Sequence, residues 1–313
     1  MDVSEELRSR GITGPVLGEE PILKAIPLPG GARVAVTVQL AFEAWSPGIS
    51  SGSVLGGALS ADAAAKGIPD FATLSWQEYG GQTGIWRLLR GLDKCGARAS
   101  CSTSALCAVV WPKAVAEIAA AGHEIVGHGY SQDQRMESLD EADDLDVVTR
   151  STEILAEVSG QRPVGWSSHG SRRGAFTIAS LLKNGYLYTN DFRDADVPYI
   201  AASAEGRNLW SLPRTDEIND MFLFRRHGNP PSAYVEYFRR ALDQLHSEGE
   251  TEPKVLTCVA HATLIGRPWG ISALAECIEY ARSKGDVWIC TRRELAEYAQ
   301  ESHEKHAAEH SVL

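Results

Sequence analysis

The sequence predicts an α/β protein built as a closed or nearly closed barrel of about seven parallel strands. Two observations support this prediction. Short β-branched, apolar segments alternate with longer amphipathic segments along the whole chain, as parallel strands do with the helices packed outside them. Polar, reactive side chains also follow the strand-like segments, and barrels of this kind carry their chemistry at the carboxyl ends of the strands.

The predicted strands are short and rich in apolar residues. Residues 33–40 form the first one, since their valine-rich composition suits a strand buried on both faces. The later strands are expected at residues 97–103, 124–127, 164–167, 186–189, 209–213, 255–260 and 287–290.

The predicted helices separate these strands. One of them, residues 139–159, has acidic early turns that complement the helix dipole. The others are expected at residues 83–94, 112–121, 174–184, 232–247, 271–284 and 292–301. Residues 46–67 form a Gly-, Ser- and Ala-rich loop whose length suggests a functional role. We therefore expect an N-terminal extension over residues 1–30, one barrel domain over 31–302 and a polar tail over 303–313.

Composition narrows the function classes. The formal net charge of −11 argues against nucleic acids and anionic membranes as partners, because binding phosphates requires clustered Lys and Arg. No apolar run approaches the ~18–20 residues that span a bilayer, and residues 1–20 lack the apolar core of an export signal. None of the six cysteines forms a C-x-x-C pair. These features predict a cytoplasmic protein.

The expected strand ends bring a reactive set of side chains together. Glu43 follows the first strand, His128 the third, Ser168 and His169 the fourth, and His261 the strand 255–260. Because parallel strands deliver their carboxyl ends to one side of a barrel, we expect these residues to share one pocket.

Several longer stretches resemble the polysaccharide deacetylase (NodB-homology) family. The resemblance is closest to its intracellular branch, which includes a metal-independent allantoinase and cyclic imide hydrolases. It covers about residues 30–300, in the family's order of motifs. The stretches that carry it are residues 33–45, 75–100, 119–133, 162–170, 185–199 and 259–270. The resemblance implies a distorted (β/α)7 barrel, a small-molecule substrate and a homo-oligomer, dimeric or tetrameric.

The first motif departs from the family at one position. Family members place an aspartate general base two residues before an acidic metal ligand, and here those positions hold Ala41 and Glu43. Alanine cannot accept a proton. Either the natural enzyme uses another base, such as Glu43, or the chain is an inactivated variant.

The family's metal-binding pair is also incomplete. His128 matches the first histidine of the pair, but Gln132 stands at the second. Glu43, His128 and Gln132 would make a poor zinc shell, because an amide oxygen is a weaker ligand than imidazole. We therefore favour a metal-free site in which His128 and Gln132 hydrogen-bond the substrate. The alternative is a weakly held zinc or other divalent ion.

The resemblance also implies roles around the pocket. His261 matches a late family histidine that acts as general acid or polarises the carbonyl. Arg267 could anchor a carboxylate or imide oxygen, or form a structural salt bridge. The remaining candidate substrate contacts are Trp45, Trp269, Ser168 and His169.

Together these features predict an amidohydrolase that cleaves a C–N bond of a small amide, imide or ureide by water attack on its carbonyl. Two alternatives remain. One is a zinc-dependent deacetylase of an N-acetylated sugar. The other is a catalytically inactive barrel that only binds ligands.

Overall fold

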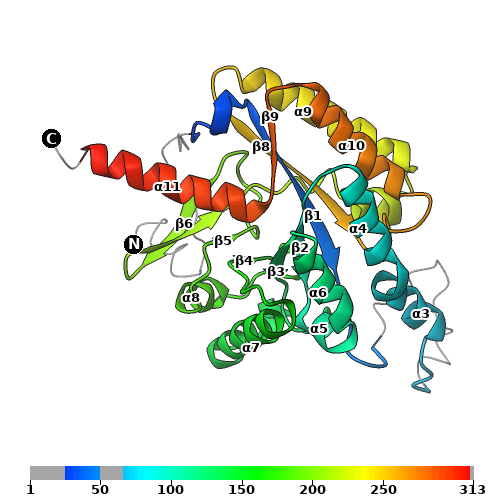
Figure 1. The fold of residues 1–313 in the computed structure, drawn as a ribbon. Helices are drawn as coiled ribbons and strands as arrows, with labels where there is room; N and C mark the ends of the chain where they lie inside the picture. Colours follow the sequence, from blue (N-terminus) through cyan, green and yellow to red (C-terminus); the bar gives the residue numbers. More distant parts are fainter. Residues whose placement is uncertain (1–24, 50–65, 311–313) are drawn as a thin grey trace.

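The computed structural model describes residues 25–49 and 66–310, which form a curled sheet surrounded by helices (Figure 1). The nine strands of this part of the chain have the order β6-β7-β5-β4-β3-β2-β1-β8, and β9 also pairs with β1. Every pairing is parallel except that of β6 with β7. The strands are β1 (Val34–Phe42), β2 (Ser100–Thr103), β3 (Glu124–Gly127), β4 (Gly165–Trp166), β5 (Tyr188–Thr189), β6 (Tyr199–Ala204), β7 (Arg207–Ser211), β8 (Lys254–His261) and β9 (Val287–Cys290).

The sheet curls into an incompletely closed barrel, which confirms the predicted fold class. Between β7 and β8, the described residues make one isolated parallel bridge, from Asn219 to Val259. The Thr257 hydroxyl also donates to the carbonyl of Pro213 at 3.0 Å. The segment that follows β7 therefore covers the open edge of β8 without forming a full strand.

The helices lie outside the sheet, as the alternation predicts. They are α3 (Phe71–Tyr79), α4 (Ile85–Lys94), α5 (Ala105–Val110), α6 (Pro112–Ala120), α7 (Glu141–Ser159), α8 (Thr177–Lys183), α9 (Pro231–Glu248), α10 (Ile271–Ser283) and α11 (Arg292–His310). Shorter turns of 3-10 helix are η1 (Pro29–Gly31), η3 (Met136–Ser138) and η4 (His169–Ser171), and turns of π-helix are η2 (Gly80–Gly84) and η5 (Met221–Arg226).

Helix α3 was not predicted, since the sequence analysis expected a helix only from residue 83. Instead, η2 joins α3 to α4 without a break. Its glycines permit close packing: a Cβ at Gly84 would lie 1.9 Å from the carbonyl oxygen of Ala262, and one at Gly81 would lie 2.1 Å from the ring of Trp111. The glycines of residues 80–84 thus allow α3 and α4 to pack closely on the loop after β8.

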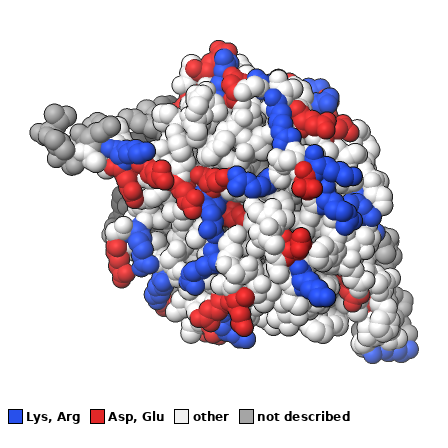
Figure 2. All heavy atoms as spheres, in the orientation of Figure 1, with Lys and Arg blue, Asp and Glu red and all other residues white. Residues whose placement is uncertain are grey.

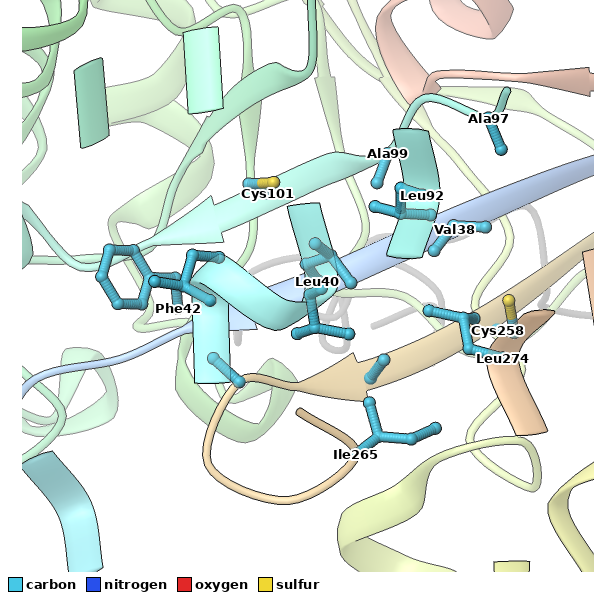
Figure 3. Packing of buried hydrophobic residues seen from close by; sticks show 14 of the residues in the cluster. Val38, Leu40, Phe42, Leu92, Ala97, Ala99, Cys101, Cys258, Ile265 and Leu274 are labelled. Atoms are coloured by element: carbon cyan, nitrogen blue, oxygen red, sulfur yellow. The ribbon is translucent and has the colours of Figure 1, made fainter. Parts of the chain in front are cut away.

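Side chains of β1 alternate between the two faces of the strand, with a period of two. The outward set packs on the helices, where Figure 3 shows Val38 beside Leu92 of α4. The outward residues are Val34, Val36, Val38, Leu40 and Phe42. They are at most 1% exposed, so they anchor the strand and fix which residues point inward.

The inward face of β1 carries polar side chains with partners across the barrel. Thr37 bonds Thr257 at 2.9 Å between hydroxyl oxygens. The amide nitrogen of Gln39 donates to Ser102 at 2.9 Å, and its oxygen accepts from Asn190 at 2.8 Å. These bonds satisfy buried polar groups and form a floor beneath the carboxyl ends of the strands.

Helix α11 covers the opposite end of the barrel. Its residues Leu295, Ala296 and Ala299 join a buried cluster with Ala35 and Val255. The helix continues to His310, so the part of the predicted tail that the structure describes is helical. Of the predicted N-terminal extension, residues 1–24 lie outside the described residues, as does most of the predicted loop 46–67.

The hairpin β6–β7 was not predicted, since only a strand at 209–213 was expected.

On the face in Figure 2, basic and acidic side chains are interleaved, and no broad patch of one sign appears. Among the helices of the described chain, none combines the length and apolar character that a bilayer crossing needs.

Candidate active site

Glu43 lies at the centre of the candidate site. It comes directly after β1, and its side chain is 11% exposed. One carboxylate oxygen, Oε1, is 3.5 Å from Nε2 of His128 and 3.9 Å from Nε2 of His261. The predicted convergence of the first strand, the third strand and the strand before residue 261 is therefore present.

The surroundings of Glu43 keep it ionised. Burial alone would raise its pKa, but the positive charges of the neighbouring histidines, that of His261 first, outweigh burial and lower the pKa to about 2. Glu43 is consequently a carboxylate throughout the physiological range. Such a group is a good electrostatic anchor and a weak base.

His128 follows β3 and is 4% exposed. Its Nδ1 is 2.5 Å from the carbonyl oxygen of Ser167, and a carbonyl can only accept, so Nδ1 carries the hydrogen. A neutral His128 then has a lone pair at Nε2, and this atom is buried without a hydrogen-bond partner among the described residues. The predicted hydrogen bond from His128 to the substrate carbonyl stays a prediction.

His261 ends β8 and is held by Asp220. Nδ1 of His261 is 2.6 Å from Oδ1 of Asp220, whose other oxygen accepts the backbone N–H groups of His261 at 2.8 Å and Ile265 at 3.1 Å. Burial lowers the pKa of His261, but the negative charges of Asp220 and Glu43 outweigh it and raise the pKa. His261 is thus set up to carry a proton at Nε2, facing Glu43.

His169 lies against His128, with the ring centroids 4.7 Å apart and the rings nearly perpendicular. Its Nε2 contacts the carbonyl oxygen of His128 at 2.5 Å, and its Nδ1 contacts that of Gln134 at 3.0 Å. Burial is the main cause that lowers the pKa of His169 to about 4. Both ring nitrogens face the backbone, so His169 supports His128 and has no nitrogen left for a substrate.

Ala41 lies on the inward face of β1, beside His261 across the strand pair. It is 5% exposed and offers only a methyl group.

The hydroxyl of Ser168 has hydrogen-bond partners within the protein. It donates to Asp191 at 2.7 Å and accepts from the indole N–H of Trp166 at 3.0 Å. Its predicted contact with a substrate stays a prediction.

Gln132 does not join the Glu43–His128 pair through any bond of the described residues. Its amide nitrogen donates to Ser104 at 3.2 Å. Together with Trp45 and His169, it instead lines a neighbouring pocket of about 330 Å³. In the described chain, no three His, Cys, Asp or Glu residues are arranged to hold a metal ion. Of the three predicted ligands, Glu43 and His128 lie together, while the amide nitrogen of Gln132 bonds Ser104, so the metal-free site stays a prediction.

The other predicted contacts come from the loop after β8. The guanidinium of Arg267 lies 4.0 Å from the ring centroid of Tyr79, while its Nε donates to the carbonyl of Thr263 at 3.0 Å. Trp269 is 45% exposed, and its ring packs against Phe224. Arg267 therefore has a defined orientation, whereas most of the Trp269 surface faces outward.

Asp220 is the site residue that the sequence analysis missed. It has 0% exposure and precedes η5, in a segment without a strand-like pattern. One signal was available: an Asn-Asp pair between the apolar residues Ile218 and Met221 places a carboxylate where burial is expected.

Comparisons with known proteins agree with the observed fold. Residues 73–189 match the sequence pattern described as "Polysaccharide deacetylase". The structure of a probable polysaccharide deacetylase from Pseudomonas aeruginosa PAO1 is 30% identical, with a TM-score of 0.81, and the match covers 92% of this chain and 99% of that one. The structure of PuuE allantoinase is also 30% identical, with a TM-score of 0.79 and coverage of 89% and 94%. A Schizosaccharomyces pombe protein, provisionally named a polysaccharide deacetylase, is 27% identical over 70% of this chain and 73% of its own length.

Proposed function

Because this chain belongs to the polysaccharide deacetylase family, we propose that it hydrolyses a carbon–nitrogen bond of a small amide, imide or ureide, linear or cyclic. One observation carries the proposal: a carboxylate lies within 4 Å of two imidazoles, and a buried aspartate holds one of them. The similarity to an allantoinase favours a small ureide-like substrate over a polymer.

In this mechanism, Glu43 and His128 position the attacking water. Both Oε1 of Glu43 and the unpartnered Nε2 of His128 accept hydrogen bonds, so a water that contacts both atoms from the barrel mouth can donate one hydrogen to each. The water oxygen attacks the carbonyl carbon, and one proton moves to Nε2 of His128. The ionised Glu43 stabilises the imidazolium that forms. Glu43 itself is a poor acceptor because its pKa is about 2.

His261 completes the reaction as general acid. Its Nε2–H protonates the leaving nitrogen as the carbon–nitrogen bond breaks, and Asp220 stabilises the charged ring before the transfer. The products are a carboxylic acid, which then ionises, and an amine or amide. Proton exchange with water resets the two histidines.

The test is hydrolysis of a panel of amides, imides and ureides by the purified protein, its Ala41→Asp variant and its His261→Ala variant. We expect the unmodified chain to hydrolyse at least one compound and His261→Ala to lower kcat by ~10² or more. Full activity in His261→Ala would remove the proposed acid. If neither the unmodified chain nor Ala41→Asp hydrolyses any compound, the chain is an inactive binding barrel.

The zinc-dependent deacetylase remains the second candidate, supported by the names of several relatives. It predicts release of acetate from N-acetylglucosamine oligomers and loss of that activity with a chelator. A small-molecule substrate and a dimeric or tetrameric assembly are part of the main proposal, and light scattering of the purified protein tests the assembly.

A further inference from the structure

Arg267 is a half-buried cation that lacks an acidic partner within residues 25–49 and 66–310. Its guanidinium is 4.0 Å from the ring centroid of Tyr79 and 5.5 Å from that of Trp76, both on α3. Only Nε has a hydrogen bond, to the carbonyl of Thr263. Burial lowers the pKa of Arg267, and the charge interaction that opposes this effect comes from Tyr79 and not from a carboxylate. An uncompensated charge of this kind is costly and points to an anionic ligand.

The two segments that contact Arg267 each carry a buried polar group without a partner among the described residues: Oγ1 of Thr263 and Nε2 of Gln77. Their residues are 2% and 4% exposed. Gln77 lies one helical turn before Gly80, and Gly80 packs so closely on Thr263 that a Cβ there would be 2.9 Å from its Cγ2. The Thr263 hydroxyl and the Gln77 amide can each donate a hydrogen bond, and a bound ligand with acceptor oxygens would satisfy them.

The loop that carries these donors is rigid and begins at the candidate general acid. The N–H groups of Leu264 and Gly266 both donate to the carbonyl of His261. Arg87 donates to the carbonyl of Gly266 at 2.5 Å. Thr263 is two residues beyond His261, so this loop connects the candidate general acid to Arg267.

We propose that Arg267, Thr263 and Gln77 form a subsite for a carboxylate, so that the substrate is an anionic amide, imide or ureide. The proposal rests on the proposed hydrolytic function for the identity of the reacting group. The planar fork of arginine matches the two oxygens of a carboxylate. A single cation suits one negative charge better than a doubly charged phosphate group.

Binding of two matched probes tests the subsite without turnover. Succinamate carries one carboxylate and one amide, whereas succinamide carries two amides. Calorimetric titration should show succinamate binding to the full chain and a Kd that rises roughly 10- to 100-fold in Arg267→Gln, the usual effect of losing a charge-assisted hydrogen bond. Thr263→Val keeps the side-chain shape and should weaken succinamate binding by roughly 3- to 10-fold.

Arg90→Gln is the matched control, because Arg90 is exposed on the neighbouring helix α4 and the same charge is removed there. Its Kd for succinamate should equal that of the unmodified chain. Equal loss of succinamate and succinamide binding in Arg267→Gln, or no binding of succinamate to the unmodified chain, overturns the subsite. If the subsite binds as expected but no substrate in the panel is hydrolysed, the proposed function fails and the subsite stands.

Discussion

Replacing Asp220 by asparagine tests how the proposed acid is tuned. The carboxylate accepts three N–H groups, from the His261 ring, the His261 backbone and the Ile265 backbone. An asparagine of the same shape has one acceptor oxygen, so its NH2 group must face at least one N–H donor. The variant also removes the negative charge next to the imidazole, which is buried with it.

The magnitude follows from these contacts. A hydrogen bond to a charged group contributes about 1.5–3 kcal/mol, and 1.36 kcal/mol corresponds to a tenfold change in a protonation equilibrium. The acid must be protonated to act, so kcat falls as pH rises through the pKa of His261. In Asp220→Asn this alkaline limb should therefore move about one to two pH units toward lower pH.

The pH dependence of the free energy of unfolding tests the same contact without a substrate. The pKa of His261 is raised in the folded state above its ordinary value of 6.5, so protonation stabilises the fold below that pH and the benefit is lost as pH rises through the folded pKa. Asp220→Asn should consequently lower the free energy of unfolding more at about pH 5.5 than at about pH 8.5.

The assay is kcat against pH for the best substrate of the panel, with urea unfolding at both pH values. Asp143→Asn is the matched control, because Asp143 is exposed on α7 and the same charge is removed there from a residue outside the candidate site. An alkaline limb that stays in place in Asp220→Asn would refute the assignment of His261 as an acid tuned by Asp220.

Three further outcomes are expected. His128→Asn should lower kcat by ~10² or more because it removes the proton acceptor at Nε2, and unchanged kcat would contradict that role. Gly84→Ala should lower the free energy of unfolding by about 1–3 kcal/mol or more, since the new Cβ meets the Ala262 carbonyl; an unchanged urea midpoint would show that the loop yields freely. Treatment with a chelator should leave kcat unchanged, because Gln132, a weaker metal ligand than histidine, bonds Ser104, whereas a loss that zinc restores would support the deacetylase alternative.

Local signals were enough for the parts of the site that lie on regular strands. The valine-rich run at β1 fixes an alternation in which Glu43 follows the inward residues Thr37 and Gln39. His128 and His261 directly follow or end apolar strands, so parallel pairing brings them to the same side of the barrel. Their convergence on Glu43 was therefore predictable without knowing a single distance.

The remaining features depend on contacts that have no local pattern. Asp220 lies in an irregular segment, and only tertiary packing shows that its oxygens meet His261 and Ile265. Helix α3 could not be read from the sequence, because the role of the η2 glycines depends on a tertiary contact. They allow the helix to pack closely on Ala262. Gln132 shows the same limit, since spacing alone did not reveal that its amide bonds Ser104.

The inward side chains of β1 explain why the identity of residue 41 matters. Thr37 and Gln39 are satisfied by partners inside the barrel, and Glu43 faces two imidazoles. Ala41 is the apolar residue between Gln39 and Glu43 on this face, so β1 itself places no charged side chain there. An aspartate there would place a second buried carboxylate on the same face of β1, and the two negative charges would compete for the proton of His261. In this chain only Glu43 faces His261 from β1, and this arrangement lets one histidine accept a proton while the other donates one.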